Sequence, residues 1–346
     1  MNHRIAIADS DIAFDCAATE SVLDAALRAG IELPYSCRKG VCGNCAGTVP
    51  EGQVAGLNDA PIRNEACLPG QVLFCMCTPR TDVQIAPVSW HRIDPTARKR
   101  FTAKVFRNQL AAPDVSVLQL RLPAGQRAKF QAGQYLQLAV GDGSTRCYSM
   151  ANAPHESDAL TLHIRHVPGG AFSARVPQLQ QGELLEIELP FGAVALDEAD
   201  TRPIVFVAGG TGFAPVKSIL DDMAKRRVLR PITLIWGARR AEGIYLRTAV
   251  AKWQKQWPDF RFVPALSDEA EVVAGDAFAG RVHEALAAHC PRLDGHVLYS
   301  CGSPGMVAAV REVAEHRLGL VAADFHADVF VDGPAAAPAP RGDPPA

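Results

Sequence analysis

The segment YSCRKGVCGNC (residues 35–45) carries three cysteines, Cys37, Cys42 and Cys45, which are separated by four and by two residues. The chain contains ten cysteines in all. Its N-terminus, MNHRIAIADSDIAF, has acidic residues where a secretory signal would have a basic region and an apolar run. We therefore expect a cytoplasmic protein, in which thiols stay reduced and disulfides do not form the framework. Three thiols this close together indicate ligands of a metal or a cluster, with a fourth ligand elsewhere.

The length and composition indicate a globular protein of two or three domains. The chain has 346 residues, of which 48% are hydrophobic and 21% charged, and its formal net charge is -2. A net charge so close to zero gives no general attraction to nucleic acids or anionic membranes. No stretch approaches the roughly 18 apolar residues that a membrane span needs. We expect neither a nucleic acid nor a membrane as a partner.

The first segment, residues 1–93, has the pattern of a small mixed sheet with one helix. RIAIADSDIAF alternates as a hairpin does, and TVPEGQV and VLFCMCTPRTDVQIAP supply further short strands. SVLDAALRAG predicts a helix with Ser21 at the N-cap, Asp24 three residues on and Gly30 as the stop. SWHRIDPTARKR (residues 89–100) is polar and contains a proline, and we expect a linker over residues 94–100.

The pattern changes twice in the rest of the chain. Residues 101–199 contain short strand-like runs divided by Gly, Pro and Asp, which predicts an antiparallel β-barrel. These runs are FTAKVF, VSVLQLRL, QYLQLAV, LTLHIRHV and LLEIELP. In residues 200–332, apolar strands alternate with glycine turns and helices, which predicts a parallel sheet covered by helices. The tail, residues 333–346, is rich in Pro and Ala, and we expect it to be disordered. The prediction is thus a multidomain protein of α+β and α/β class.

The three clustered cysteines follow the spacing C-x4-C-x2-C, in which a [2Fe-2S] cluster takes three thiolates from one loop and a fourth from a distant cysteine. The fourth ligand could be Cys67, Cys75 or Cys77. The glycines of the loop let backbone amides point at the sulfides. Zinc is the alternative, but zinc sites usually have two close Cys or His pairs, and the second half here offers only Cys-Met-Cys.

The same segment resembles the plant-type ferredoxins. The resemblance selects Cys75, which has the usual separation from the third ligand and follows the strand VLFC, with Cys77 as the second choice. It also implies a β-grasp fold for this domain. For the remaining cysteines, Cys16, Cys67, Cys147 and Cys290, we expect buried small side chains.

Two elements of the second segment resemble the ferredoxin-NADP reductase superfamily. RCYSM (residues 146–150) matches its Arg-x-Tyr-Ser motif, which implies Arg146 on the flavin diphosphate, Tyr148 on the isoalloxazine ring and Ser149 near its N5 edge. A guanidinium suits a diphosphate, and a phenol ring suits a flat heteroaromatic. HIRHVPGGAFS matches the second flavin element, and we expect Gly170 and Ser173 to open a helix whose amides receive phosphate oxygens.

Two glycine-containing turns of the third segment resemble the nucleotide-binding elements of the same superfamily. VFVAGGTGFAP follows a strand and opens a helix, so its Gly209, Gly210, Thr211 and Gly212 leave room for a pyrophosphate. YSCGSPGM matches the second element, which implies Cys301 near the nicotinamide C4. The residues that would then line the nucleotide are Gly302, Ser303 and Pro304, where Ser303 replaces the commoner proline.

Residues at the ends of two predicted strands indicate two further sites. TLIWGARR ends in Arg239 and Arg240, which could pair with a 2'-phosphate and favour NADPH over NADH. A solvated charged turn is the alternative for this pair. FHADVF resembles the closing strand of these reductases, which implies Asp328 and Phe330 beside the flavin. Ser149, Cys301 and Asp328 are thus the candidates for shaping the hydride-transfer pocket.

The order of the three segments resembles the reductase components of bacterial ring-hydroxylating dioxygenases. The resemblance implies electron flow from NAD(P)H through FAD and a [2Fe-2S] cluster to a Rieske-type oxygenase. A flavin is needed between the other two, because NAD(P)H gives up a hydride whereas the cluster accepts one electron at a time. Two alternatives remain, a reductase for a CDP-6-deoxyhexulose dehydrase and a zinc-bearing or redox-sensing binding protein.

Overall fold

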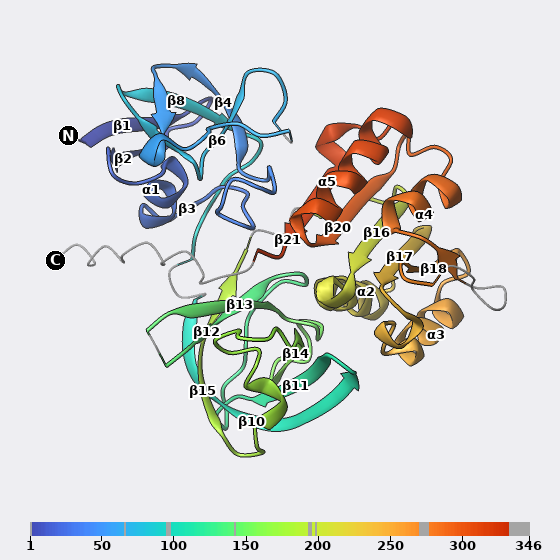
Figure 1. Cartoon of the computed structure of the whole chain (residues 1–346). Coiled ribbons are helices and arrows are strands. Elements are labelled where there is room, and N and C mark those ends of the chain that lie inside the picture. Colours follow the sequence, from blue (N-terminus) through green and yellow to red (C-terminus); the bar gives the residue numbers. More distant parts are fainter. Residues whose placement is uncertain are drawn as a thin grey trace. The chain divides into compact units, whose positions relative to one another are not determined.

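The computed structural model describes residues 2–65, 67–94, 98–141, 143–192, 196–197, 199–269 and 277–331 (Figure 1). The expected tail lies outside these residues, as does the middle of the expected linker. The chain forms two compact units, one holding the described residues up to Asp94 and the other those from Arg98 to Val331.

The first unit is built on a five-stranded mixed sheet in the order β2-β1-β8-β4-β6. Strand β1 runs parallel to β8, and the other neighbours are antiparallel. Two further pairs, β3 with β9 and β5 with β7, complete the unit. Its elements are β1 (Asn2–Ile7), β2 (Ala13–Ala17), α1 (Val22–Arg28), β3 (Ile31–Glu32), β4 (Ala46–Glu51), β5 (Val54–Gly56), η1 (Leu57–Asp59), β6 (Gln71–Leu73), β7 (Cys77–Pro79), β8 (Val83–Pro87) and β9 (His91–Arg92).

Helix α1 confirms the predicted caps. Ser21 is the N-cap, and its Oγ accepts a hydrogen bond from the Asp24 backbone N at 3.0 Å. Gly30 lies just beyond the helix with φ +75°, a conformation that glycine adopts without steric cost. The buried face of the helix, Val22, Leu23 and Ala26 among it, packs into the core of the first unit.

The polar stretch SWHRIDPTARKR, which holds the expected linker of residues 94–100, contributes to strands near both of its ends. His91 and Arg92 pair with Ile31 and Glu32, and His91 Nε2 lies 2.8 Å from Glu32 Oε2. Strand β10 begins at Lys99, before the expected end of the linker. The polar composition of this stretch gives no sign of these pairings, because the residues that it contributes to the two strands, His91, Arg92, Lys99 and Arg100, are all exposed.

The second unit begins with a six-stranded antiparallel sheet in the order β13-β12-β15-β10-β11-β14. A bridge between Met150 and Leu162 joins its two edges, so the sheet curls into the predicted barrel. Leucines and aromatic side chains fill the interior. The elements are β10 (Lys99–Ala112), β11 (Val115–Arg121), β12 (Tyr135–Ala139), β13 (Thr145–Ser149), β14 (Ala159–Arg165), η2 (Val176–Gln178) and β15 (Leu184–Phe191).

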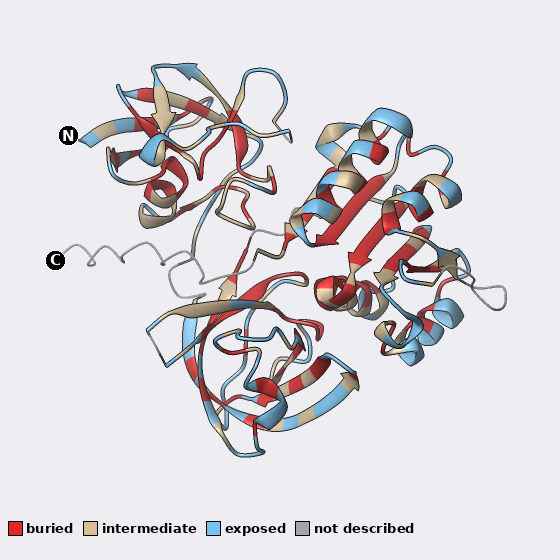
Figure 2. Ribbon diagram, in the orientation of Figure 1, coloured by how far each residue is buried: buried red, intermediate tan, exposed pale blue. Residues whose placement is uncertain are grey.

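The rest of the second unit is a six-stranded parallel sheet in the order β19-β18-β17-β16-β20-β21, as predicted. Figure 2 shows β16 and β20 almost wholly buried at its centre, as expected for parallel strands covered by helices. The strands are β16 (Ile204–Gly209), β17 (Ile232–Ala238), β18 (Phe260–Leu266), β19 (Phe278–Ala279), β20 (Val297–Gly302) and β21 (Phe325–Val329). The helices are η3 (Gly210–Gly212), α2 (Phe213–Arg226), η4 (Ala241–Gly243), α3 (Arg247–Gln256), α4 (Val282–His289), α5 (Pro304–Glu312), η5 (Val313–Arg317) and η6 (Ala322–Asp324).

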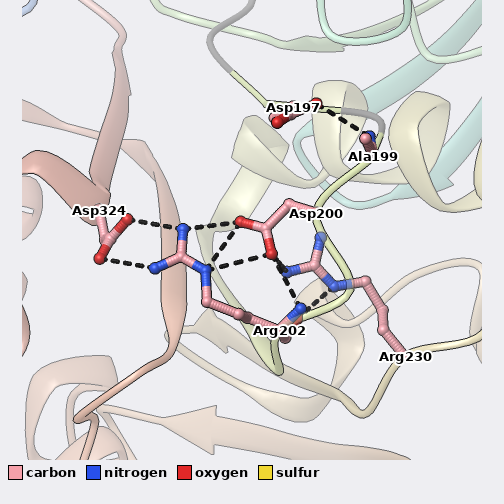
Figure 3. A network of polar contacts seen from close by, with 6 residues as sticks. All are labelled: Asp197, Ala199, Asp200, Arg202, Arg230 and Asp324. Carbon is pink, nitrogen blue, oxygen red and sulfur yellow. Dashed lines mark hydrogen bonds and ion pairs between the residues drawn. The ribbon is translucent and has the colours of Figure 1, made fainter.

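A polar network ties the starts of two of these strands together (Figure 3). The Arg202 guanidinium donates to both oxygens of Asp324 at 2.8 and 2.9 Å and to Asp200 Oδ2 at 2.7 Å. Arg202 precedes β16, and Asp324 immediately precedes the edge strand β21. Buried Arg230 donates through Nε to the Arg202 carbonyl oxygen at 2.5 Å. The network therefore fixes where the edge strand begins.

No helix among the described residues combines the length and the apolar character required to cross a bilayer.

Candidate functional site

The segment from Cys37 to Cys45, which we call the cluster loop, brings its first two cysteines together. The Sγ atoms of Cys37 and Cys42 lie 3.3 Å apart. Backbone N–H groups of Lys39, Val41 and Cys42 donate to Cys37 Sγ at 3.4, 3.4 and 3.3 Å. The hydrogen bond with Cys42, together with these amides, lowers the pKa of Cys37 to about 5. Cys37 is thus prepared to act as a thiolate.

Sheet pairing brings the other two predicted ligands together. Cys45 directly precedes β4, Cys75 follows β6, and these strands pair antiparallel with Ala46 opposite Leu73. The Phe74 backbone N donates to the Cys45 carbonyl oxygen at 3.1 Å. A hydrogen bond between the thiols of Cys45 and Cys75, and then burial, raise the pKa of Cys45 well above its usual value. Cys45 and Cys75 therefore form a second thiol pair.

The other cysteines of the first unit lie in different surroundings. Cys77 is fully buried near Cys16 and Cys75, and burial raises its pKa to about 12. Cys67 is half-buried, with its Sγ 3.6 Å from Asn64 Oδ1. Of the four cysteines expected to be buried, Cys16 and Cys290 are.

Cys147 is exposed, contrary to the expectation that it is buried. It lies on β13 between Arg146 and Tyr148, so its side chain points to the opposite face of the strand from theirs. In this part of the barrel that face is open to solvent.

The four thiols of Cys37, Cys42, Cys45 and Cys75 fit a two-iron cluster. Among the described residues, no three His, Cys, Asp or Glu side chains are grouped so as to hold a single metal ion. The thiols form two pairs instead, and a [2Fe-2S] cluster takes two thiolates on each iron. The amides directed at Cys37 supply the hydrogen bonds that such sulfurs accept.

The strand β13 presents the first flavin element. Arg146 donates through Nη1 to Ser144 Oγ at 2.7 Å and to the Thr145 carbonyl oxygen at 2.9 Å. Burial raises the pKa of Tyr148, whose ring lies 5.7 Å from that of Phe172 at a tilt of 55°. Phe172 belongs to the second flavin element, so the fold brings the two elements into contact. A guanidinium, a phenol ring and a glycine turn here fit a flavin nucleotide.

The second flavin element does not open the helix expected at Ser173. Residues 171–175 form turns, followed by the short 3-10 helix η2. Pro177 lies within η2, and a proline restricts the residue before it and removes a backbone donor, which keeps a longer helix from forming. A Cβ at Gly170 would lie 2.2 Å from Ser173 Oγ, so the absence of a side chain there leaves the hydroxyl free of obstruction.

The glycine turn after β16 is tightly packed. A Cβ on Gly209 would meet Met306 Sδ at 2.4 Å, and one on Gly212 would meet the Cys301 carbonyl oxygen at 2.2 Å. Gly210 has φ +54°, and its carbonyl oxygen accepts a hydrogen bond from Trp236 Nε1 at 3.0 Å. Thr211 lies between these glycines within η3. The turn lies at the carboxyl end of a central strand, where open α/β sheets bind nucleotides.

Three predicted pocket residues from different segments converge. Ser149 Oγ lies 3.5 Å from Asp328 Oδ2, and Cys301 Sγ lies 3.9 Å from the same oxygen. Cys301 is opposite Asp328 in the pairing of β20 with β21, and Ser149 comes from the barrel. Burial, and then the Asp328 carboxylate, raise the pKa of Cys301 well above its usual value. The flavin strand and the nucleotide sheet therefore meet at a common point within the second unit.

The remaining predicted residues flank this point or lie at the next strand end. Ser303 is the N-cap of α5, and its Oγ accepts a hydrogen bond from the Met306 backbone N at 3.4 Å; Pro304 begins the helix. A serine can thus replace the usual proline here because it caps the helix. The Phe330 backbone N donates to the Gly302 carbonyl oxygen at 2.9 Å. Exposed Arg239 and Arg240 follow β17, whose Gly237 pairs with Gly209.

The structure adds side chains that the sequence did not single out. The guanidinium of Arg165, at the end of β14, lies over Gly210: a Cβ there would be 2.5 Å from Arg165 Nη2. On α2, Lys217 Nζ donates to the Ala151 carbonyl oxygen at 3.2 Å. Buried Ser218 donates to the Asn152 carbonyl oxygen at 2.7 Å. Only Arg165 left a signal, since it lies within the quoted HIRHVPGGAFS segment. The contacts of α2 join residues too distant in the chain for a motif to reveal.

Family models match all three predicted segments. Residues 5–80 match the 2Fe-2S iron-sulfur cluster binding domain, residues 102–196 the oxidoreductase FAD-binding domain, and residues 206–312 the oxidoreductase NAD-binding domain. These matches contradict the alternative hypothesis that the chain is a zinc-bearing binding protein.

Similar proteins cover nearly the whole chain. Terephthalate 1,2-dioxygenase, reductase component 2, from Comamonas is 61% identical over 96% of this chain and 99% of its own length. CDP-6-deoxy-L-threo-D-glycero-4-hexulose-3-dehydrase reductase from Yersinia pseudotuberculosis is 32% identical over 96% of this chain and 99% of its own length. A crystal structure of a cytochrome P450 reductase from Amycolatopsis superposes with a TM-score of 0.74 at 30% identity, covering 95% of this chain and 98% of that one.

The paired thiols, the flavin strand and the glycine turn thus occur in a chain that matches all three domain models and aligns with its relatives over nearly its full length. The chain is an NAD(P)H-dependent flavin and iron-sulfur oxidoreductase, and it belongs to the family of ferredoxin-NADP reductase-like reductases with an N-terminal 2Fe-2S ferredoxin domain.

Proposed function

We propose that this chain is the reductase component of a terephthalate 1,2-dioxygenase and passes electrons from NAD(P)H through FAD and a [2Fe-2S] cluster to a Rieske-type oxygenase. The identity of 61% to a terephthalate dioxygenase reductase, over 96% of the chain, is the observation that carries the proposal. The oxygenase would bind and dihydroxylate the aromatic ring. This chain would never contact the aromatic compound.

Cys37, Cys42, Cys45 and Cys75 are our proposed cluster ligands. Their two close thiol pairs support this choice, and the pairing of Cys45 with Cys75 favours Cys75 over Cys77 as the fourth ligand. Plant-type clusters have reduction potentials of about -400 mV, and Rieske clusters have higher ones. An electron therefore passes from the plant-type cluster to the Rieske cluster.

Arg146, Tyr148, Gly170 and Ser173 are the residues we assign to the flavin. Arg146 would bind the diphosphate, and the half-buried Tyr148 ring would lie against the isoalloxazine. The open turn at Gly170 leaves the Ser173 hydroxyl and nearby amides available for phosphate oxygens. When bound, the flavin supplies the chemistry that converts one hydride into two single-electron transfers.

Ser149, Cys301 and Asp328 shape the pocket in which the nicotinamide would meet the flavin. Their contacts of 3.5 and 3.9 Å hold one carboxylate oxygen between a hydroxyl and a thiol, so each side chain limits the movement of the others. Positioning of this kind is one way in which a protein accelerates hydride transfer. The glycine turn and Arg165 would hold the pyrophosphate of the nucleotide.

NADPH is our proposed electron donor. Arg239 and Arg240 follow the strand next to the glycine turn, where a cation can pair with a 2'-phosphate. Steady-state kinetics with both nucleotides test this assignment, and a strong preference for NADH would contradict it. Arg239→Ala and Arg240→Ala should raise KM for NADPH and leave KM for NADH unchanged.

The partner is tested by mixing the purified chain with a candidate oxygenase and following NAD(P)H consumption. Terephthalate-dependent consumption with a terephthalate dioxygenase is the expected result. The same assay with a CDP-6-deoxyhexulose dehydrase covers the alternative, which the relative at 32% identity keeps open. Coupling to the dehydrase alone would contradict the proposal.

A further inference from the structure

The side chain of Asn64 donates two hydrogen bonds to the cluster loop, and we call this pair of contacts the Asn64 clamp. Asn64 lies in the segment between η1 and β6. Its Nδ2 donates to the Gly40 carbonyl oxygen at 2.8 Å and to the Val41 carbonyl oxygen at 3.0 Å. Its Oδ1 lies 3.6 Å from Cys67 Sγ. Two carbonyl acceptors on one side require the amide nitrogen there, so the orientation of the Asn64 side chain is fixed.

Each of the two carbonyls belongs to a peptide group whose N–H serves Cys37. The Gly40 carbonyl shares its peptide group with the Val41 N–H, and the Val41 carbonyl shares its peptide group with the Cys42 N–H. Val41 N lies 3.4 Å and Cys42 N 3.3 Å from Cys37 Sγ. One side chain therefore holds two of the three amides that donate to this sulfur.

The loop needs such a clamp because no strand ladder fixes it. Residues 37–45 form neither helix nor strand, and Arg38, Gly40 and Gly43 have φ values of +53°, +72° and +80°. Hydrogen bonds in a chain also polarise one another, so a carbonyl that accepts a bond makes the N–H of its peptide group a stronger donor. Asn64 thus affects both the position and the strength of the bonds to Cys37.

We propose that Asn64 is a positioning residue that raises the reduction potential of the cluster by holding the Val41 and Cys42 amides against Cys37. The inference rests on the proposed role of Cys37 as a ligand. Hydrogen bonds to ligand sulfurs stabilise the reduced cluster, because reduction adds negative charge, and they are among the factors that set its potential.

A redox titration of the full chain, loaded with cluster and flavin, tests the proposal. The cluster is followed by its electron paramagnetic resonance and the flavin by its absorbance. Asn64→Ala should shift the cluster to a more negative potential and leave the flavin midpoint where it is. An unchanged cluster potential in Asn64→Ala overturns the proposal, whatever happens to turnover.

A second variant decides the matter if Asn64→Ala does not retain its cluster. Asn64→Asp keeps the shape of the side chain, loses both N–H donors and adds one negative charge. Exposed Glu65 is the next residue, so Glu65→Gln measures the effect of one charge at this place. A downward shift in Asn64→Asp that exceeds the upward shift in Glu65→Gln supports the clamp, and one that does not exceed it overturns the clamp.

The premise is tested apart from the clamp. A Cys37→Ser chain that kept the wild-type cluster spectrum would show that Cys37 is no ligand, and it would overturn the proposed ligand set. An unchanged potential in Asn64→Ala, with the cluster lost in Cys37→Ser, would overturn only the role of Asn64.

Discussion

At the scale of single residues, the second unit brings side chains from distant segments together at the proposed hydride-transfer pocket. Asp328 Oδ2 lies within 3.5 Å of the Ser149 hydroxyl and 3.9 Å of the Cys301 thiol. Residues 149 and 301 belong to the barrel and to the parallel sheet, so their meeting depends on how these two parts of the second unit pack. Substitutions of these three side chains should therefore alter the rate of hydride transfer more than the affinity for NAD(P)H.

We expect Ser149→Ala to slow reduction of the flavin by NAD(P)H about fivefold, since one hydrogen bond of about 1 kcal/mol would be lost from the pocket. Stopped-flow absorbance of the flavin measures this step, and the cluster spectrum should not change. Cys147→Ser is the matched control, because Cys147 is two residues away on the same strand and exposed. Equal rates of flavin reduction in Ser149→Ala and the wild type would rule out this role.

His163 predicts a pH dependence of stability. It is fully buried where β14 meets the parallel-sheet part, with its Nδ1 3.2 Å from the Tyr245 hydroxyl and its Nε2 without a hydrogen-bond partner among the described residues. Burial, and then the charge of Lys217, lower its pKa to about 3. The unfolded chain binds a proton near pH 6.5, the folded chain only near pH 3, so stability is lost as the pH falls between these values.

The slope attributable to His163 should reach about 1.4 kcal/mol per pH unit. Urea unfolding of the wild type and of His163→Gln, measured between pH 8 and pH 4, tests this. The two chains should differ in slope below pH 6.5 and run parallel above pH 7. Parallel behaviour over the whole range would count against the assignment.

At the scale of elements, the parallel sheet depends on how its edge strand begins. Arg202 links Asp200, ahead of β16, with Asp324, ahead of β21, and Asp200 Oδ1 lies 3.8 Å from Nη2 of buried Arg230 (Figure 3). Asp328 stands four residues beyond Asp324 on the edge strand. An anchor at the start of the strand therefore helps to set the position of the pocket carboxylate.

Asp200→Ala should destabilise the chain by roughly 1–3 kcal/mol, because the buried Arg230 guanidinium loses its counter-charge. Chemical denaturation of the full chain measures the free energy of unfolding. Asp222→Ala is the control: its ion pair with Arg226 is an i,i+4 contact on a helix surface, worth no more than about 0.5 kcal/mol. If both substitutions cost the same, the network contributes nothing beyond ordinary surface pairs.

Local sequence patterns predicted structure correctly where the pattern lies within a few neighbouring residues. The helix capped by Ser21, the strand-turn-helix at Gly209 and the cysteine spacing are cases of this kind. The expected helix at Ser173 fails because Pro177 intervenes, and Cys147 is exposed because strand alternation outweighs the usual burial of cysteine. The segment that holds Arg165 was singled out, but its contact with Gly210 could not be predicted, and neither could that of Asn64 with the cluster loop, since each contact joins segments whose separation in the chain carries no pattern.

At the scale of the whole molecule, the proposed cluster ligands lie in one unit, and the residues that we assign to the flavin and the nucleotide lie in the other. The three predicted segments thus reduce to two compact units, because the barrel and the parallel sheet share contacts such as those of Ser218 and Lys217. Damage to the cluster should therefore leave the reaction of NAD(P)H with the flavin intact.

We expect Cys75→Ser to abolish the cluster and electron transfer to the oxygenase, while NAD(P)H-dependent reduction of ferricyanide through the flavin persists. Iron and sulfide analysis, together with both activity assays, measures these effects. Cys77→Ser is the matched control, since Cys77 is two residues away and buried near Cys16, and it should keep its iron. Loss of iron from Cys77→Ser but not from Cys75→Ser would reverse the choice of the fourth ligand.

The pairing of β1 with β8 bears on how the protein is made. Strand β8 lies between β1 and β4 in the five-stranded sheet, so β1 has no parallel neighbour until residues 83–87 have been synthesised. Cys75 is synthesised shortly before them. Iron loading must therefore follow synthesis of nearly the entire first unit, and a nascent chain stalled before Val83 would offer the assembly machinery thiols without a finished scaffold.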